Sequence, residues 1–180
     1  CIPTKMCVRP SALARIPEEA ARLGVEQAMV SVDWPGMRDR IFSRIDAVSS
    51  GGRQYREELE NVDLISEKVT LTGPHSFRTE SGAEVDAEQM VIAAGSRPVL
   101  PEVPGIDLPQ VHTSETIMRL EDLPQKILIV GGGYIACEFA GIFSGLGSDV
   151  VQINRSRGLM NQLDADISAR YSEQAQKNWS

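Results

Sequence analysis

Two parts of this sequence hold residue types that could do chemistry: a cysteine at residue 1 and a glycine-rich turn at residues 131–136. The turn follows a short apolar run and has the pattern G-x-G-x-x-A. Gly131 permits a tight turn, Gly133 lets the backbone approach a ligand, and Ala136 lets a helix pack closely on a strand. The start of that helix offers free amide donors and partial positive charge. The turn therefore predicts a site for the pyrophosphate of a dinucleotide.

The residues after the next strand predict which nicotinamide coenzyme binds. An acidic side chain about 20 residues beyond the glycines would accept a hydrogen bond from the ribose of NAD, whereas an arginine suits the extra phosphate of NADP. Asn154 holds this position and is followed by Arg155 and Arg157. Because no carboxylate is there to repel a phosphate and two guanidiniums are there to bind it, the sequence favours NADP.

The cysteine at the amino end is a candidate reactive thiol. Cys1 begins a segment with helical character, so its sulfur can lie near a helix N-terminus, where the pKa of a thiol falls. A buried, unreactive cysteine is the alternative for this residue taken alone. Cys7 and Cys137 form no metal-binding spacing with it, and we interpret both as small packing residues.

A β-α-β unit must position the glycine turn. We predict its first strand at Lys126–Val130 and its second at Asp149–Asn154. The apolar face of the helix between them consists of Ile135, Phe139, Ile142, Phe143 and Leu146. Asp164 is expected to cap a last helix. The inward face of that helix would be Ile167, Tyr171 and Ala175.

The amino-terminal part is predicted to be largely helical. The pattern at Met6–Leu23 indicates a helix with a kink or a new start at Ser11, because Pro10 disfavours a continuous helix. Asp33 predicts the start of an amphipathic helix, which we expect to end in the loop at residues 49–52.

Short strands and a linker should follow. The apolar run Met90–Ala94 is expected to be a strand buried on both faces. The proline-rich residues 97–105 suggest a linker near a domain boundary, and Thr113 or Ser114 should cap a short helix through Leu120. Further strands are predicted at residues 62–65, 68–71 and 76–79.

Composition limits the class of protein. The 180 residues are 42% hydrophobic and 24% charged, as in a soluble globular protein. The net charge of −7 argues against nonspecific nucleic-acid binding, and no apolar run predicts a membrane span or a secretory signal. The histidines and cysteines suggest no metal site. We expect a cytoplasmic protein, and the cysteine at position 1 suggests an internal piece of a larger enzyme.

The stretches Cys1–Lys5 and Ile127–Ala140, in this order, resemble the pyridine nucleotide–disulfide oxidoreductases. The resemblance implies an α/β fold: part of an FAD-binding Rossmann-like domain with a β-meander, at residues 1–115, followed by the start of an NAD(P)-binding Rossmann domain at residues 116–180. It also implies that FAD and NADP are the cofactors.

The resemblance gives roles to particular residues. Cys1 matches the second cysteine of a C-x-x-x-x-C redox pair, which lies against the flavin. Lys5 and Glu138 match a charged pair near the flavin ring, and Tyr134 matches a tyrosine that covers the nicotinamide pocket in some members. The backbone of Lys68 and Val69 would face the adenine of FAD. The expected cofactor-binding residues are Lys5, Lys68, Val69, Ala94, Gly95, Ser96, Gly131, Gly133, Tyr134, Ile135, Ala136, Glu138, Asn154 and Arg155.

The implied activity is electron transfer from NADPH through FAD and a cysteine pair to a low-molecular-weight disulfide. Residues 1–6, 87–98 and 112–119 are most similar to members that reduce mycothione; members acting on dihydrolipoamide or glutathione are alternatives, as is a redox-inactive nucleotide-binding module. A histidine–glutamate pair from the partner of a homodimer would complete the cycle and lies outside these residues. We therefore expect this chain alone to have no turnover.

Overall fold

The computed structural model describes residues 2–180, which form two compact units. One unit contains the described residues up to Ile45 together with Gly105–Ser180, and the other is Asp46–Pro104. Helix α3 (Trp34–Glu57) contributes residues to both. The division at residue 115 that the sequence predicts is a different one, and it stays a prediction.

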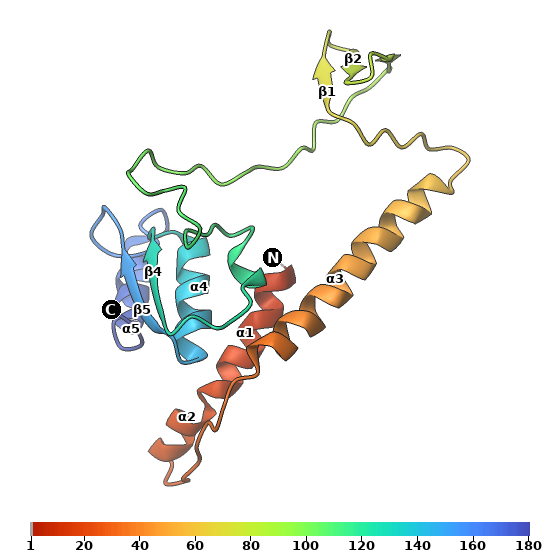
Figure 1. Cartoon of the computed structure of the whole chain (residues 1–180). Helices are drawn as coiled ribbons and strands as arrows, with labels where there is room; N and C mark the ends of the chain where they lie inside the picture. Colours follow the sequence, from red (N-terminus) through yellow and green to blue (C-terminus); the bar gives the residue numbers. More distant parts are fainter. Residues whose placement is uncertain (1) are drawn as a thin grey trace. The chain divides into compact units, whose positions relative to one another are not determined.

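The β-α-β unit is present in the larger unit (Figure 1). Strand β4 (Lys126–Val130) pairs in parallel with β5 (Asp149–Ile153), and α4 (Tyr134–Gly145) connects them. Helix α5 (Ala165–Ala175) follows, and the carboxylate of Asp164 accepts a hydrogen bond from the Asp166 amide as the predicted cap. The predicted inward face of α5 is only partly correct, because Ile167 is 57% exposed.

Helix α4 is the centre of the larger unit. Its apolar residues meet α1 (Ile2–Ala14) on one side and the two strands on the other. The rings of Phe143 and Trp34 lie 5.7 Å apart, which joins the start of α3 to the same core. The fully or nearly buried core residues are Cys7, Trp34, Met37, Ile41, Ile117, Phe139, Ala140, Ile142, Phe143, Leu146 and Val150.

Helix α1 passes through a proline without ending. It continues beyond Pro10 to Ala14, and α2 (Ile16–Arg22) follows after one residue, so no new helix starts at Ser11 as the sequence suggested. Ser11 is buried against α4, where its hydroxyl donates to the Gly141 carbonyl at 3.1 Å. Packing on α4 therefore offsets the backbone hydrogen bond that the proline removes.

Helix α3 is also longer than predicted. Asp33 accepts the Gly36 amide at 2.9 Å, as expected for its start, but the helix continues through both glycines at 51–52 to Glu57. The ion pair between Arg53 and Glu57, at 2.8 Å, supports this last part. The short helix expected from residue 114 is only a 3₁₀ turn, Ile117–Arg119.

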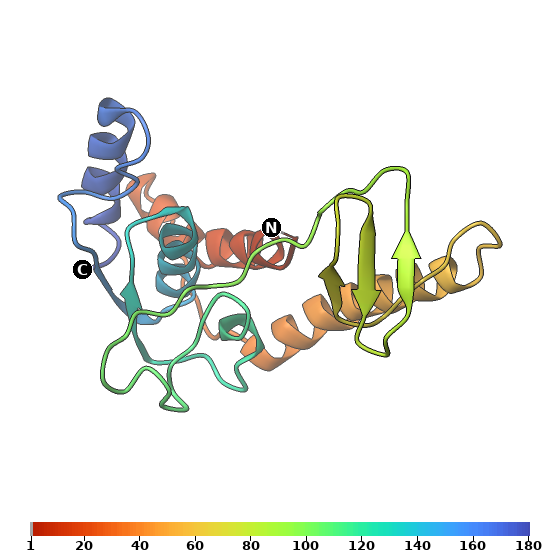
Figure 2. The same ribbon diagram turned by 90° about the horizontal axis from the view of Figure 1, so that it is seen from above.

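The smaller unit contains a β-meander (Figure 2). Strands β1 (Val69–Leu71), β2 (Ser76–Thr79) and β3 (Glu84–Asp86) are antiparallel in the order β1-β2-β3. The strand predicted at residues 62–65 is absent from the described chain, and so is the one at Met90–Ala94. Val91 is 90% exposed, because no described strand pairs with this apolar run.

Candidate dinucleotide and flavin site

The glycine turn has the backbone geometry that a pyrophosphate site needs. Gly131 has φ +139°, which favours glycine, and a Cβ at Gly133 would have nothing within 4 Å. A Cβ at Gly132 would lie 2.9 Å from the Asn154 amide nitrogen, so this glycine is required for close packing. The turn thus combines a left-handed position, a tight contact and an open approach.

The carbonyls of the turn are hydrogen-bonded within the protein, whereas no side chain occupies the amides at the start of α4. The carbonyls of Gly132 and Gly133 accept hydrogen bonds from the amides of Met160 (2.7 Å) and Cys137 (3.0 Å). No side chain caps the start of α4, where Gly133 is the N-cap residue. The first amides of α4 are therefore available to an anion, which is the arrangement that binds a phosphate at a helix N-terminus.

Two side chains at the opening of α4 are exposed beside this turn. Tyr134 is 65% exposed and Ile135 is 47% exposed. Ala136 is partly buried beside Gly131, where a Cβ added to the glycine would lie 3.4 Å from the alanine methyl group. The side chain of Tyr134 is thus open to solvent, and the roles predicted for Tyr134, Ile135 and Ala136 stay predictions.

The loop after β5 holds the residues predicted to choose the coenzyme. The Asn154 amide donates to the Ser156 carbonyl at 2.8 Å and to the Gly158 carbonyl at 2.9 Å, so it shapes its own loop. Arg155 and Arg157 are exposed. In the described chain no acidic side chain pairs with either guanidinium, and both are free to bind an anion.

A strand residue that the sequence analysis missed lies behind the glycine turn. The amide nitrogen of Gln152 donates to the Gly131 carbonyl at 2.9 Å, and its amide oxygen accepts from the Trp179 indole at 2.8 Å. The Cys137 sulfur is 3.7 Å from the same amide nitrogen. A neutral amide inside a strand carries no spacing signal, so neither Gln152 nor Trp179 was predicted.

Lys5 and Glu138, which are 133 positions apart, form an ion pair between α1 and α4. The lysine side chain is 62% exposed and the glutamate side chain 33% exposed. The structure thus brings together two of the residues expected near a flavin ring. Cys1, the third member of this predicted group, lies outside the described residues.

The other cysteines are free thiols in the core. Cys7 and Cys137 are 3% and 2% exposed, in agreement with packing roles. Burial raises the pKa of the Cys7 thiol, and the nearby Arg40 charge partly opposes this shift. Burial, and then the neighbouring Cys137, raise the pKa of Tyr171 as well.

The remaining predicted flavin contacts belong to the smaller unit. Val69 lies in β1, an edge strand, and the Lys68 carbonyl accepts the Glu80 amide at 2.9 Å. Gly95 has φ +67°, as a tight turn requires, with Ala94 and Ser96 in exposed irregular chain on either side. Their contact with a flavin stays a prediction.

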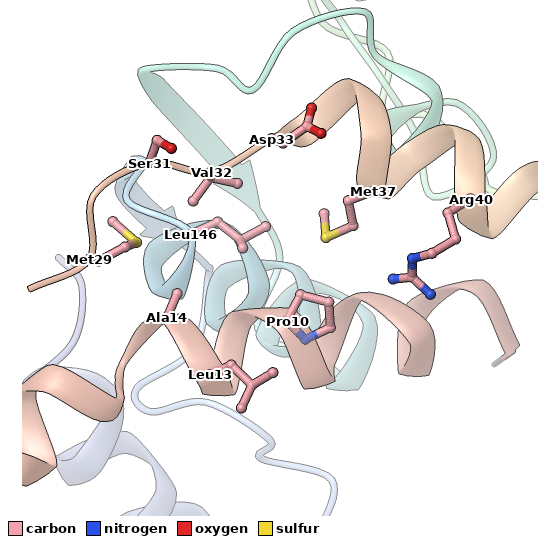
Figure 3. A pocket seen from close by; sticks show the side chains of 10 residues that line it. All are labelled: Pro10, Leu13, Ala14, Met29, Ser31, Val32, Asp33, Met37, Arg40 and Leu146. Carbon is pink, nitrogen blue, oxygen red and sulfur yellow. The ribbon is translucent and has the colours of Figure 1, made fainter.

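A hollow of about 400 Å³ lies among α1, the segment before α3 and the start of α3 (Figure 3). Met37 and Arg40 extend from α3 toward Pro10 on α1. None of its lining residues was predicted to bind a cofactor. Those residues are Pro10, Leu13, Ala14, Met29, Ser31, Val32, Asp33, Met37, Arg40 and Leu146.

Two features are absent from residues 2–180. No helix there has both the length and the apolar character needed to cross a membrane. The same residues contain no group of three or more histidine, cysteine or acidic side chains arranged to hold a metal ion.

Comparison with known proteins gives consistent matches along the chain. The family model described as "Pyridine nucleotide-disulphide oxidoreductase" matches residues 1–178. The chain is 40% identical to mycothione reductase from Mycobacterium tuberculosis (strain H37Rv), covering 99% of this chain and 40% of that protein. It is 34% identical to glutathione reductase from Burkholderia cepacia, covering 99% of this chain and 39% of that protein. The chain therefore spans about two fifths of the length of these relatives.

A solved structure shows the same fold. The HOCl-induced flavoprotein disulfide reductase RclA from Escherichia coli superimposes with a TM-score of 0.79 at 25% identity, covering 99% of this chain and 37% of that chain. This match confirms the predicted α/β class of a flavoprotein disulfide reductase.

Proposed function

Because the chain belongs to the pyridine nucleotide–disulphide oxidoreductase family, we propose that the full-length protein is an NADPH-dependent flavoprotein that reduces a low-molecular-weight disulfide, mycothione first among the candidates. The observation that carries this proposal is the Lys5–Glu138 ion pair. It links the helix that follows Cys1 to the helix that opens at the glycine turn. A thiol segment and a nucleotide turn are thereby held together, as a reductase with both needs.

The residues of the site fit the two cofactors. The open amides of α4 and the glycine turn would hold the pyrophosphate of the nicotinamide coenzyme, with Tyr134 beside them. Lys5 and Glu138 would lie near the flavin ring, where a cation favours the anionic reduced form. FAD, when bound, supplies the group that accepts a hydride and passes on an electron pair. Each cycle would consume NADPH, a proton and a disulfide, and release NADP⁺ and two thiols.

The protein contributes a redox pair and a charged frame. Cys1 would form one half of the redox disulfide and, once reduced, the resulting dithiol would attack the substrate disulfide. Arg155 and Arg157 support the choice of NADPH, since two exposed guanidiniums suit the extra phosphate. Assembly as a homodimer and a cytoplasmic location belong to the same proposal.

The substrate can be tested with the full-length protein. Purified protein should show a flavin absorbance spectrum and should oxidise NADPH faster than NADH in the presence of mycothione. Glutathione disulfide and lipoamide are the comparison substrates, because relatives named glutathione reductase and dihydrolipoyl dehydrogenase also match this chain. Faster turnover with either would replace mycothione, and a protein without flavin would overturn the proposal.

The 180-residue chain alone should be inactive. We propose that it binds FAD weakly and has no disulfide reductase turnover, because it spans only about two fifths of its relatives. NADPH-dependent disulfide reduction by the purified chain would contradict this.

A further inference from the structure

We propose that Gln152 is a positioning residue for the dinucleotide turn and that Trp179 orients its amide. This inference rests on the proposed use of the turn by NADPH. Gln152 lies in β5, on the strand next to the one that leads into the turn. Its side chain contacts the backbone of Gly131, so it would act on the coenzyme through this glycine and not by direct contact.

The amide of Gln152 is held at both ends. Its nitrogen donates to the Gly131 carbonyl at 2.9 Å, and its oxygen accepts from the Trp179 indole nitrogen at 2.8 Å. The indole N–H can only donate, so the amide oxygen must face Trp179 and the amide nitrogen must face Gly131. Trp179 therefore favours the same amide orientation that the Gly131 carbonyl requires.

The Gly131 backbone is fixed from two directions by this strand. Its amide donates to the Ile153 carbonyl at 2.8 Å, while its carbonyl accepts from Gln152. Gly131 has φ +139°. Because glycine has no Cβ, its backbone can adopt conformations that other residues rarely adopt. Two hydrogen bonds from neighbouring positions of β5 restrict that freedom.

The direction of the Gly131 carbonyl matters for an anionic ligand. A carbonyl oxygen turned toward the phosphates would repel them, whereas one held by Gln152 points toward the strand. The next carbonyls, of Gly132 and Gly133, are likewise bonded within the protein. The Gln152 contact therefore helps to present amides, and not carbonyls, to the pyrophosphate.

The test measures NADPH affinity of the full-length protein by fluorescence titration and by steady-state kinetics. Gln152→Met keeps the side-chain volume but removes the donor. We expect Kd and KM for NADPH to rise about tenfold, as for one lost buried hydrogen bond, with kcat at saturating NADPH within about twofold of the original. Gln152→Glu replaces the donor with acceptors and should raise KM further. Asp149→Asn, at the exposed other end of β5, is the matched control and should change neither constant.

The role of Trp179 has its own test. Trp179→Phe keeps an aromatic ring but removes the N–H. It should raise KM for NADPH roughly threefold, because the Gln152 amide then loses one of the two hydrogen bonds that orient it. In the Gln152→Met background the same change should have no further effect. Equal effects in both backgrounds would overturn the orienting role, and an unchanged Kd in Gln152→Met would overturn the positioning role. If the unaltered protein fails to bind NADPH, the proposed function itself is wrong.

Discussion

Lys5 and Glu138 form an ion pair between α1 and α4, although 133 positions separate them in the chain. Neither helix could place its charge in this way alone. α1 begins directly after Cys1, and α4 begins at the glycine turn. This pair therefore connects the helix next to the proposed redox cysteine with the helix that begins at the proposed nucleotide site.

Replacing this lysine should slow flavin reduction. In the full-length protein, Lys5→Met removes a cation that would favour the reduced flavin, so we expect the rate of flavin reduction by NADPH to fall about 10- to 100-fold. Stopped-flow absorbance measures this rate directly. Arg53→Met, which breaks a different, exposed ion pair within α3, is the control and should have no effect. An unchanged rate of flavin reduction in Lys5→Met would contradict a role of the Lys5–Glu138 pair in this step.

Gly141 and Gly145 of α4 should respond in opposite ways to substitution. A Cβ at Gly145 would lie 3.1 Å from the Ser11 carbonyl and 2.9 Å from the Arg15 guanidinium, whereas one at Gly141 would have nothing within 4 Å. We expect Gly145→Ala to destabilise the protein by about 1–3 kcal/mol through overpacking. Gly141→Ala should stabilise it by about 0.5–1 kcal/mol through helix propensity. Urea unfolding measures both, and equal signs would contradict the packing argument.

Whether an element could be predicted from the sequence depends on where the groups that it contacts lie in the chain. The pairing of β4 with β5 and the cap at Asp164 were predicted because the interacting groups lie close in sequence. The prediction of a buried strand at Met90–Ala94 was wrong. An apolar run becomes a buried strand only beside other strands, and no described strand pairs with this one. Local pattern therefore identified elements whose partners follow nearby.

The site shows the same division. The spacing of the glycines predicted the dinucleotide turn, and the family resemblance predicted that Lys5 and Glu138 lie close together. Gln152 and Trp179 were missed because their contact depends on which face of β5 points to the turn and on where the chain after α5 returns to β5. An amide or an indole has many ordinary uses in a protein. Only the three-dimensional arrangement identifies these two as supports of the turn.

The arginines after β5 should determine coenzyme preference. Both guanidiniums are exposed, and attraction to the extra phosphate of NADPH would be lost on their removal. We expect the double substitution of Arg155 and Arg157 by alanine to lower kcat/KM for NADPH about 10- to 100-fold in the full-length protein. The value for NADH should stay within about threefold. Arg170→Ala on α5 is the control, since that side chain pairs with Glu173, and an equal loss for both coenzymes would contradict a phosphate-binding role.

The buried thiol of Cys7 should make stability fall at alkaline pH. Because burial raises its pKa in the folded state, the unfolded chain releases this proton first, at its ordinary pKa of about 8.5. The contribution of the neutral thiol is thus complete below about pH 8 and is lost as the pH rises through the folded-state pKa, with a slope of at most about 1.4 kcal/mol per pH unit.

Cys7→Ala should remove this part of the pH dependence. The free energy of unfolding, measured by urea titration between pH 7 and pH 10, should decline less steeply in the variant than in the unaltered chain. Ser43→Ala, at an exposed position of α3, should leave the decline unchanged. Parallel pH profiles for Cys7→Ala and the unaltered chain would show that the thiol is accessible to water and that its packing against the core is looser than its 3% exposure indicates.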